Sequence, residues 1–280
     1  DILIIDDNSA SMSPEQNAMA SRFSSFITAL DNKNIDYRIG IITTDVTATT
    51  GNGPRAINGN GALQDGNLIT FNDGSKYLTP STVNKTSLFS AAIQRQETIS
   101  CESYLTQNPG ASNYAANCVS PDERGIYAAN LVVQNNPSGF IRGDSSLAVV
   151  VLSDEDVRST AYSSDVSYSL DAMDMPQTLI SNIQNRYTGK SFAVHSIIVK
   201  PGTLNAGITA NAAADQLLAA FSINGTSAAS ALPTTLFNGG DSACLNAQSA
   251  QVNNVRGSYG YIYALASRMT GGYEGTICAS

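Results

Sequence analysis

The stretch that most constrains the fold of this chain is its first twelve residues. Residues 2–5 read Ile-Leu-Ile-Ile, and such an unbroken apolar run predicts a strand buried on both faces, as in a parallel sheet. The run changes abruptly into the polar pattern Asp7-x-Ser9-x-Ser11. Three side-chain oxygens are therefore expected on a short turn at the carboxyl end of a buried strand, where open α/β sheets place their binding sites.

A helix is predicted directly after this turn. Ser13 suits the N-cap, Pro14 suits the first helical position, and Gln16 completes a capping box. The apolar side chains that follow recur at spacings of three and four, which indicates one buried helix face; they are Met19, Phe23, Phe26, Ile27 and Leu30.

Strands and helices are predicted to alternate along the rest of the chain. Further strands are expected at residues 37–44, 68–71, 147–152, 192–199 and 273–278. Helices are expected at residues 88–98, 120–134, 176–187, 212–221 and 261–269. This order predicts an α/β fold with a doubly wound, mainly parallel central sheet and helices on both faces, in a single domain over residues 1–280. Long stretches without periodicity are interpreted as insertions at about 46–86, 99–119 and 200–257.

The net charge and the apolar content of the chain exclude some classes of partner. A net charge of −8 with only 15 Lys and Arg residues argues against nucleic acid, which selects for basic surfaces. No apolar run approaches the roughly 20 residues that cross a bilayer, so no membrane insertion by this domain is expected. Because the chain begins directly on a strand, we expect any signal peptide or lipid anchor to lie outside this sequence.

The chain has four cysteines and no Cys-x-x-Cys pair, and four cysteines allow three pairings. Closure of a short local loop favours Cys101–Cys118, which leaves Cys244–Cys278 to tie a late loop to the final strand. Two disulfides would indicate an oxidising compartment, and hence a secreted or cell-surface protein. The alternative is four free, buried thiols in a cytosolic chain.

The turn after the first strand resembles the metal-ion-dependent adhesion site of the von Willebrand factor type A domain family, whose first motif is Asp-x-Ser-x-Ser. Here the motif residues are Asp7, Ser9 and Ser11, with Ala10 where that family often has glycine. The family takes a second aspartate from the turn after its central strand, and Asp154 stands at that place here. The resemblance implies a Rossmann-like fold and a metal site built from these residues. The alternative is a turn that merely caps the helix behind it.

The resemblance also implies a Thr or Ser ligand just before a later helix. Ser120 is the nearest match, although the usual Thr is absent and Pro121 follows directly. Glu123 is a rival oxygen donor in the same turn. Both side chains would equally serve as caps of the helix expected at 120–134, so this further ligand is left open between them.

The likeness covers nearly the whole chain and is closest to bacterial cell-envelope proteins with this domain. Such proteins carry similar Ser-Asp-Glu-Asp segments, here at residues 153–156. They also tend to end on Thr-Gly-Gly, an aromatic residue and a late cysteine, here residues 270–273 and Cys278.

The ligand types determine which ion is expected. Carboxylate and hydroxyl oxygens without His or Cys suit Mg²⁺, Mn²⁺ or Ca²⁺ rather than zinc. Because hydroxyls carry no charge, an ion held this way keeps an affinity for an incoming carboxylate. The sequence therefore predicts a non-enzymatic domain that recognises a protein or glycan outside the cell through a bound divalent ion.

Two alternatives come from other classes of protein. The first is a metal-dependent hydrolase, because Asp6, Asp45, Glu155 and Asp156 are expected near the same site; the competing interpretation makes these four solvated loop charges. Against it, the only histidine, His195, lies mid-strand and is interpreted as a satisfied core residue, and there is no Gly-x-Ser-x-Gly motif. The second alternative is a structural envelope module whose metal only stabilises the turn.

Overall fold

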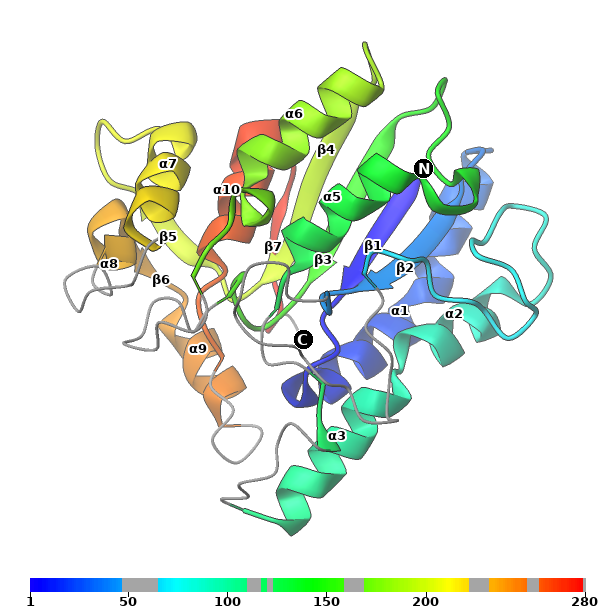
Figure 1. Cartoon of the computed structure of the whole chain (residues 1–280). Helices are drawn as coiled ribbons and strands as arrows, with labels where there is room; N and C mark the ends of the chain where they lie inside the picture. Colours follow the sequence, from blue (N-terminus) through cyan, green and yellow to red (C-terminus); the bar gives the residue numbers. More distant parts are fainter. Residues whose placement is uncertain are drawn as a thin grey trace.

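Five parallel strands form the central sheet of the computed structural model, in the order β2-β1-β3-β4-β7 (Figure 1). Their bounds are β1 (Ile2–Asp6), β2 (Ile39–Thr43), β3 (Leu147–Leu152), β4 (Phe192–Ile198) and β7 (Glu274–Thr276). The structure describes residues 1–46, 65–109, 117–119, 123–158, 169–221, 232–250 and 257–278. The predicted doubly wound α/β fold is confirmed.

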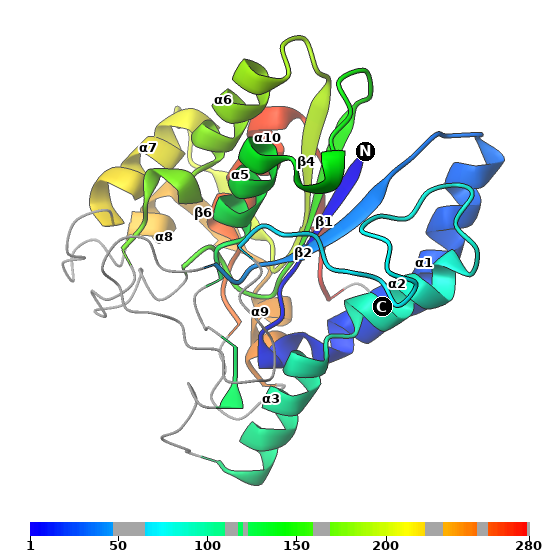
Figure 2. The same ribbon diagram turned by 45° about the vertical axis from the view of Figure 1, so that its right-hand side comes forward.

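Helices lie on both faces of this sheet (Figure 2). One face carries α1 (Ser13–Asn32) and α2 (Lys85–Ile93), and the other carries α5 (Gly125–Asn135), α6 (Pro176–Arg186) and α10 (Tyr261–Thr270). The side chains of β1 alternate between the two cores: Leu3 and Ile5 pack with the α5 side, and Ile4 packs with the α1 side. This burial on both faces is why residues 2–5 are continuously apolar.

The described helices cover the α1 side of the sheet over β2 but not over β3 and β4. Every residue of β2 is buried, whereas β4 alternates between buried and half-buried positions. Its buried residues Val194, Ser196 and Ile198 face α10, and His195 and Ile197 between them are half-buried. Among the described helices, none lies over the α1 side of β3 and β4.

Several predicted elements differ from the observed ones. Residues 68–71 are not a strand, although the Ile69 amide donates to the Ile41 carbonyl of β2 over 2.9 Å. The helix expected at 88–98 is two helices, α2 and α3 (Gln96–Gln107). The region after Cys101, expected to be a loop, is therefore helical as far as Gln107.

The capping box predicted for α1 is absent, and Ser120, expected to cap the helix at 120–134, lies outside the described residues. Helix α1 begins as expected, but its N-cap is Met12 and no side chain caps it, because Gln16 bonds Asp6 and Thr98 instead. Helix α5 begins at Gly125, five residues later than expected, with no side-chain cap. Phe26, expected on the buried face of α1, is 41% exposed.

The long insertion at 200–257 contains more structure than the single helix predicted. Its described elements are a two-stranded antiparallel ribbon, β5 (Pro201–Leu204) and β6 (Phe237–Gly240), and the helices α7 (Ala210–Phe221), α8 (Leu232–Leu236) and α9 (Ser242–Ser249). Short 3₁₀ turns lie elsewhere, at η1 (Ala10–Met12), η2 (Pro137–Gly139) and η5 (Ala172–Asp174).

Both predicted disulfides are present, Cys101–Cys118 and Cys244–Cys278. The alternative of four free thiols is wrong, since all four cysteines are paired. Two disulfides are consistent with an oxidising, extracytoplasmic location. Within the described residues, no helix has the length and apolarity that a membrane span needs.

Candidate metal centre

The Asp7-x-Ser9-x-Ser11 turn is held in place by its own hydrogen bonds. The Asp7 amide donates to the Leu152 carbonyl at the end of β3 over 3.0 Å, which ties the start of the turn to the neighbouring strand. Asp7 Oδ1 accepts a hydrogen bond from the Ser9 amide over 2.8 Å. As a result the Ser9 and Ser11 hydroxyls lie 3.2 Å apart. The three predicted ligands on this turn are therefore brought together.

The fourth predicted ligand, Asp154, joins this group from β3. Strands β1 and β3 are neighbours, with Asp6 in register with Leu152, so the turns that follow them meet. The Ser11 hydroxyl donates to Asp154 Oδ1 over 3.1 Å. Asp154 is fully buried, and its Oδ2 atom has no hydrogen-bond partner among the described residues. A buried carboxylate oxygen without a donor is costly and indicates that a cation or a water belongs beside it.

Sequence reasoning missed Ser153 as a member of this cluster. Its hydroxyl donates to Asp7 Oδ2 over 2.6 Å, and the Glu155 amide donates to the same hydroxyl over 3.2 Å. Ser153 therefore fixes the second oxygen of Asp7, while the Ser9 amide fixes the first. Its position between the apolar run of β3 and Asp154 is the only sequence signal that could have identified it.

Glu123 is the fifth predicted ligand that the structure describes; Ser120 lies outside the described residues. Glu123 is 1% exposed, and neither of its carboxylate oxygens has a hydrogen-bond partner in the described part of the chain. Its carbonyl accepts from the Arg158 amide over 2.9 Å, which fixes the backbone beside α5. The alternative that Glu123 caps α5 is thereby excluded, since no side chain caps that helix.

The cluster carries several negative charges that raise one another's pKa values. Burial, and then the Asp7 and Glu155 carboxylates, raise the pKa of Asp154 well above its usual value. Burial, and then the Glu155 and Asp7 charges, do the same for the pKa of Glu123. Burial and the Asp7 charge raise the pKa of Glu155 to about 7. Burial also raises the pKa of Asp7, against the opposing effect of the bonds from Ser153 and Ser9.

These observations test whether a hard cation fits the site. Buried carboxylates that repel one another are stabilised by a positive charge among them, and the unbonded oxygens of Asp154 and Glu123 could ligate it. No three His, Cys, Asp or Glu side chains of the described ranges form a metal-binding group by themselves. A cation here would therefore depend on the serine hydroxyls as well. Such an all-oxygen donor set fits Mg²⁺, Mn²⁺ or Ca²⁺ and does not fit zinc.

The cluster is enclosed by the protein. Asp7, Ser11 and Asp154 have no exposed surface, Ser9 is 3% exposed and Glu155 is 8% exposed. Burial strengthens every electrostatic interaction in the cluster, because little water is present to screen it. It also limits how a partner side chain can approach an ion held there.

Three of the four other acidic residues expected near the site, Asp6, Asp45 and Asp156, have hydrogen-bond partners, and the fourth is Glu155. Asp6 accepts from Gln16, Asp45 accepts from Asn8, and both Asp156 oxygens accept from the Ile262 amide at the start of α10. All are buried, so their interpretation as solvated loop charges is wrong.

His195 takes no part in the cluster. It lies in the middle of β4, in register with Val150 of β3. Val150 precedes Asp154 by four residues, so His195 lies about 13 Å from the level of Asp154 along the strand direction. Its Nδ1 atom accepts a hydrogen bond from the Tyr273 amide over 3.1 Å. The prediction of a satisfied histidine is confirmed, but the residue is half-buried on the open sheet face rather than in the core.

Comparison of this chain with models of protein families, with curated proteins and with solved structures finds no match in any of the three.

Proposed function

We propose that this chain is a divalent-cation-dependent ligand-binding domain of the von Willebrand factor type A kind. The observation that carries the proposal is the contact between Ser11 Oγ and Asp154 Oδ1. It brings the two halves of the predicted motif into one buried cluster with Asp7 and Ser9. A turn that only capped α1 would not need an aspartate from β3, and no side chain of this turn caps α1.

In this proposal Asp7, Ser9, Ser11 and Asp154 hold the ion, which supplies a positive charge able to bind a carboxylate. Glu123 is the better candidate for a further ligand within the described residues, because both of its oxygens are buried and unbonded. Ser120 remains its rival from the sequence. Mg²⁺ is the preferred ion, with Mn²⁺ and Ca²⁺ as alternatives.

The proposed partner is a protein or glycan on another cell or matrix, bound through one of its carboxylates. The disulfides support an extracellular or cell-surface location, where such a partner is available. The proposed domain is not an enzyme: its only histidine is mid-strand, and Asp6, Asp45 and Asp156 are held by hydrogen bonds from neighbouring groups.

Metal binding is tested by calorimetry with Mg²⁺ and Mn²⁺. Asp7→Ala should abolish binding and Asp154→Ala should weaken it. Asp73→Ala is the matched control, because this carboxylate is exposed and bonded only within its own loop. Unchanged affinity in Asp7→Ala would show that the metal site is wrongly assigned.

Recognition is tested by pull-down from cell surfaces with and without EDTA. Capture should require the ion and should fail in Ser9→Ala as well as Asp7→Ala. Exchange of residues 200–257 should change which partner is captured while metal affinity stays the same. Equal capture with and without chelator would contradict recognition through the ion.

Burial of the cluster favours a second candidate, a structural module whose ion only stabilises the turn. The two candidates share the calorimetric result and differ in the pull-down. For the structural module, added Mg²⁺ should raise the unfolding temperature while cell-surface capture does not depend on the ion.

A further inference from the structure

The carboxylate of Glu123 is buried beside the proposed metal site. Glu123 is 1% exposed, and neither of its carboxylate oxygens accepts a hydrogen bond from the part of the chain that the structure describes. The Glu123 carbonyl accepts from the Arg158 amide over 2.9 Å. The next amide, that of Arg124, donates to the Thr44 carbonyl over 3.1 Å. The backbone is therefore anchored, and a buried carboxylate held in this way needs a positive charge or a donor beside it.

The charged neighbours of Glu123 belong to the acidic cluster. After burial, the charges of Glu155 and Asp7 are the largest causes of the raised pKa of Glu123, and Glu155 lies within hydrogen-bonding reach of it. Ionised carboxylates only accept hydrogen bonds, so two of them cannot bond each other without a proton or a cation between them. Asp7 and Glu155 are themselves linked through the Ser153 hydroxyl. Glu123 therefore faces the cluster that contains the Asp7 turn.

The charge of this cluster opposes an additional carboxylate. Its four acids are Asp7, Glu123, Asp154 and Glu155, and none of them forms an ion pair with a Lys or Arg among the described residues. A divalent ion balances only two of these four charges. A partner's carboxylate that approached the ion would therefore meet a net negative charge, and like charges repel strongly where little water screens them. The charge stays constant only if one of the four acids gives way.

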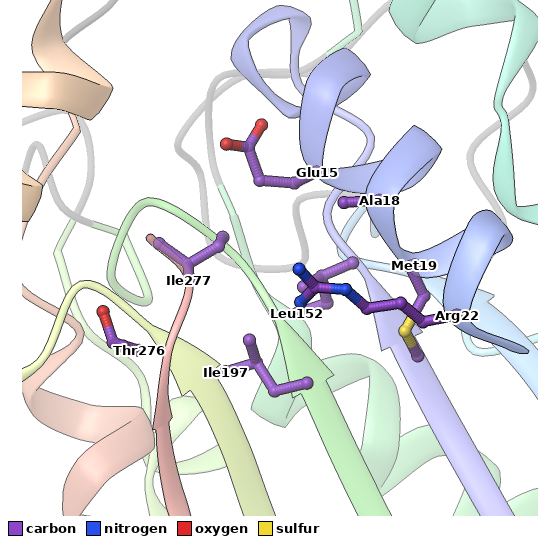
Figure 3. Close-up of a pocket in the computed structure, with 8 residues that line it drawn as sticks. All are labelled: Glu15, Ala18, Met19, Arg22, Leu152, Ile197, Thr276 and Ile277. Carbon is purple, nitrogen blue, oxygen red and sulfur yellow. The ribbon is translucent and has the colours of Figure 1, made fainter. Parts of the chain in front are cut away.

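The cluster is also closed toward the hollow beside α1. This hollow, of about 110 Å³, is lined among others by Glu15 and Arg22 of α1, by Leu152 and Ile197 of the sheet, and by Ile277 beyond β7 (Figure 3). None of the proposed metal ligands lines it, and the described ones are at most 3% exposed. A partner's carboxylate therefore reaches the ion only after a side chain of the cluster has moved.

Glu123 is the proposed ligand whose carboxylate can move most easily. Both Asp7 oxygens accept hydrogen bonds within the cluster, and Asp154 accepts one from the Ser11 hydroxyl. Glu123 can leave without breaking a hydrogen bond to any described residue. A glutamate also has one more rotatable side-chain bond than an aspartate, so its carboxylate can swing away while its backbone stays anchored.

We propose that Glu123 is an internal ligand that keeps the metal site closed until a partner's carboxylate takes its place. One carboxylate is exchanged for another at the ion, so the charge around the ion does not change. This inference rests on the proposed function, since it needs an ion at the Asp7 turn. It makes recognition depend on the release of Glu123, and the apparent affinity for a partner is reduced by the fraction of molecules in which Glu123 is still bound.

The test measures how many positions of bound Mn²⁺ are open to water, from the relaxation of solvent protons at saturating protein. Glu123→Ala should bind Mn²⁺ at least about tenfold more weakly in calorimetry, and its bound Mn²⁺ should relax water protons more strongly, because water takes the vacated position. Glu155→Ala is the matched control, since it removes a neighbouring buried acid that is not a proposed ligand, and should leave water relaxation unchanged. Unchanged relaxation in Glu123→Ala, or an equal increase in Glu155→Ala, would overturn the inference.

Acetate, the simplest carboxylate probe, tests whether an external carboxylate takes the vacated position. It should raise the Mn²⁺ affinity of Glu123→Ala at least about threefold and lower the water relaxation by its bound Mn²⁺. It should have little effect on the unaltered protein, where Glu123 already holds that position. Chloride at the same ionic strength is the control for salt. An equal effect of acetate on both proteins would overturn the inference.

Asp7→Ala separates this inference from the proposed function, and cooperative thermal unfolding in EDTA shows that each variant is folded. Loss of Mn²⁺ by Asp7→Ala, together with unaltered Mn²⁺ affinity and water relaxation in Glu123→Ala, would overturn the inference alone and leave the metal site in place. A chain that binds no Mn²⁺, or binds it equally well as Asp7→Ala, would overturn both.

Discussion

The Ser11 hydroxyl donates a hydrogen bond to Asp154 Oδ1 over 3.1 Å, although the two residues are 143 positions apart in the chain. This bond joins the turn after β1 to the turn after β3, and both turns are buried. The same pair of turns is joined a second time by the bond from Ser153 to Asp7. The acidic cluster is therefore a product of two adjacent strand ends, and its charges cannot separate without breaking these bonds.

Asp154 and Asp156 should respond oppositely to substitution. Asp154→Asn should lower metal affinity at least about tenfold and leave the metal-free stability unchanged or higher, because it removes one of several repelling charges. Asp156→Ala should lower the free energy of unfolding by about 2 kcal/mol, because both Asp156 oxygens accept from the Ile262 amide of α10, and should retain the metal. Calorimetry and urea unfolding measure both; loss of metal by Asp156→Ala alone would contradict the assignment.

The metal-free protein should lose stability as the pH rises. The raised pKa values mean that the folded state holds more protons than the unfolded state between about pH 4.5 and pH 7, and unfolding free energy falls with pH under that condition. Glu155, with its pKa raised from 4.5 to about 7, contributes on the order of 3 kcal/mol to this loss. Urea unfolding in EDTA at pH 5 and pH 8 measures it.

Saturating Mg²⁺ should reduce or reverse that pH dependence, because ion binding favours the ionised carboxylates and stabilises only the folded state. Asp154→Asn in EDTA is the control, and its stability should vary less with pH. A metal-free protein that is more stable at pH 8 than at pH 5 would contradict the mutual repulsion of these acids.

The Cys101–Cys118 disulfide should contribute both to the stability of the fold and to the metal affinity of the Asp7-x-Ser9-x-Ser11 turn. Its 17-residue separation corresponds to about 3 kcal/mol of stability in the chain-entropy model. Cys101 and Cys118 also pack on Ala10 inside the motif, so the double Cys→Ser variant should bind Mg²⁺ more weakly. Removal of Cys244–Cys278, which does not belong to that cluster of packed side chains, is the control for metal affinity. Equal affinity in the two double variants would show that the first disulfide acts on stability alone.

The buried Gln16 side chain should contribute strongly to stability, because it bonds groups from separate parts of the chain. Its Nε2 atom donates to Asp6 Oδ2, the Asp7 carbonyl and Thr98 Oγ1, and its Oε1 atom accepts from the Arg95 amide. Gln16→Ala should cost roughly 3 kcal/mol in urea unfolding, because it leaves buried groups without partners. Gln94→Ala, which removes an exposed bond to Asn17, should cost less than about 0.5 kcal/mol. Similar costs for both variants would contradict this role.

Local sequence patterns correctly predicted the elements that they encode. The apolar runs of β1 and β3 identified parallel strands, and the resemblance of the polar residues after each run to the von Willebrand factor type A motif predicted that Asp7, Ser9, Ser11 and Asp154 lie together at one edge of the sheet. The cysteine pairing followed from loop closure and elimination. These predictions succeeded because strand burial and short-range closure depend on neighbouring residues.

Local patterns failed where the surroundings of a side chain depend on residues far away in the sequence. Gln16 matched a capping box, yet Asp6 and Thr98 offered it buried partners. Phe26 matched the buried face of α1, yet it is 41% exposed and lines a hollow between α1 and the sheet. In both cases the periodicity of the helix was correctly recognised, but the environment of the side chain depended on other elements.

The fold class, the two disulfides and the residue types available to an ion can all be inferred from the order of the amino acids. Three other features depend on how the chain is packed in space: Ser153 and Glu123 join the cluster, the acids around it are buried, and no described helix covers the α1 side of β3 and β4. The first group depends on residues close together in the sequence, and the second on residues far apart. Burial and charge repulsion are sums over elements far apart in the chain, and they become defined only when the sheet brings those elements together.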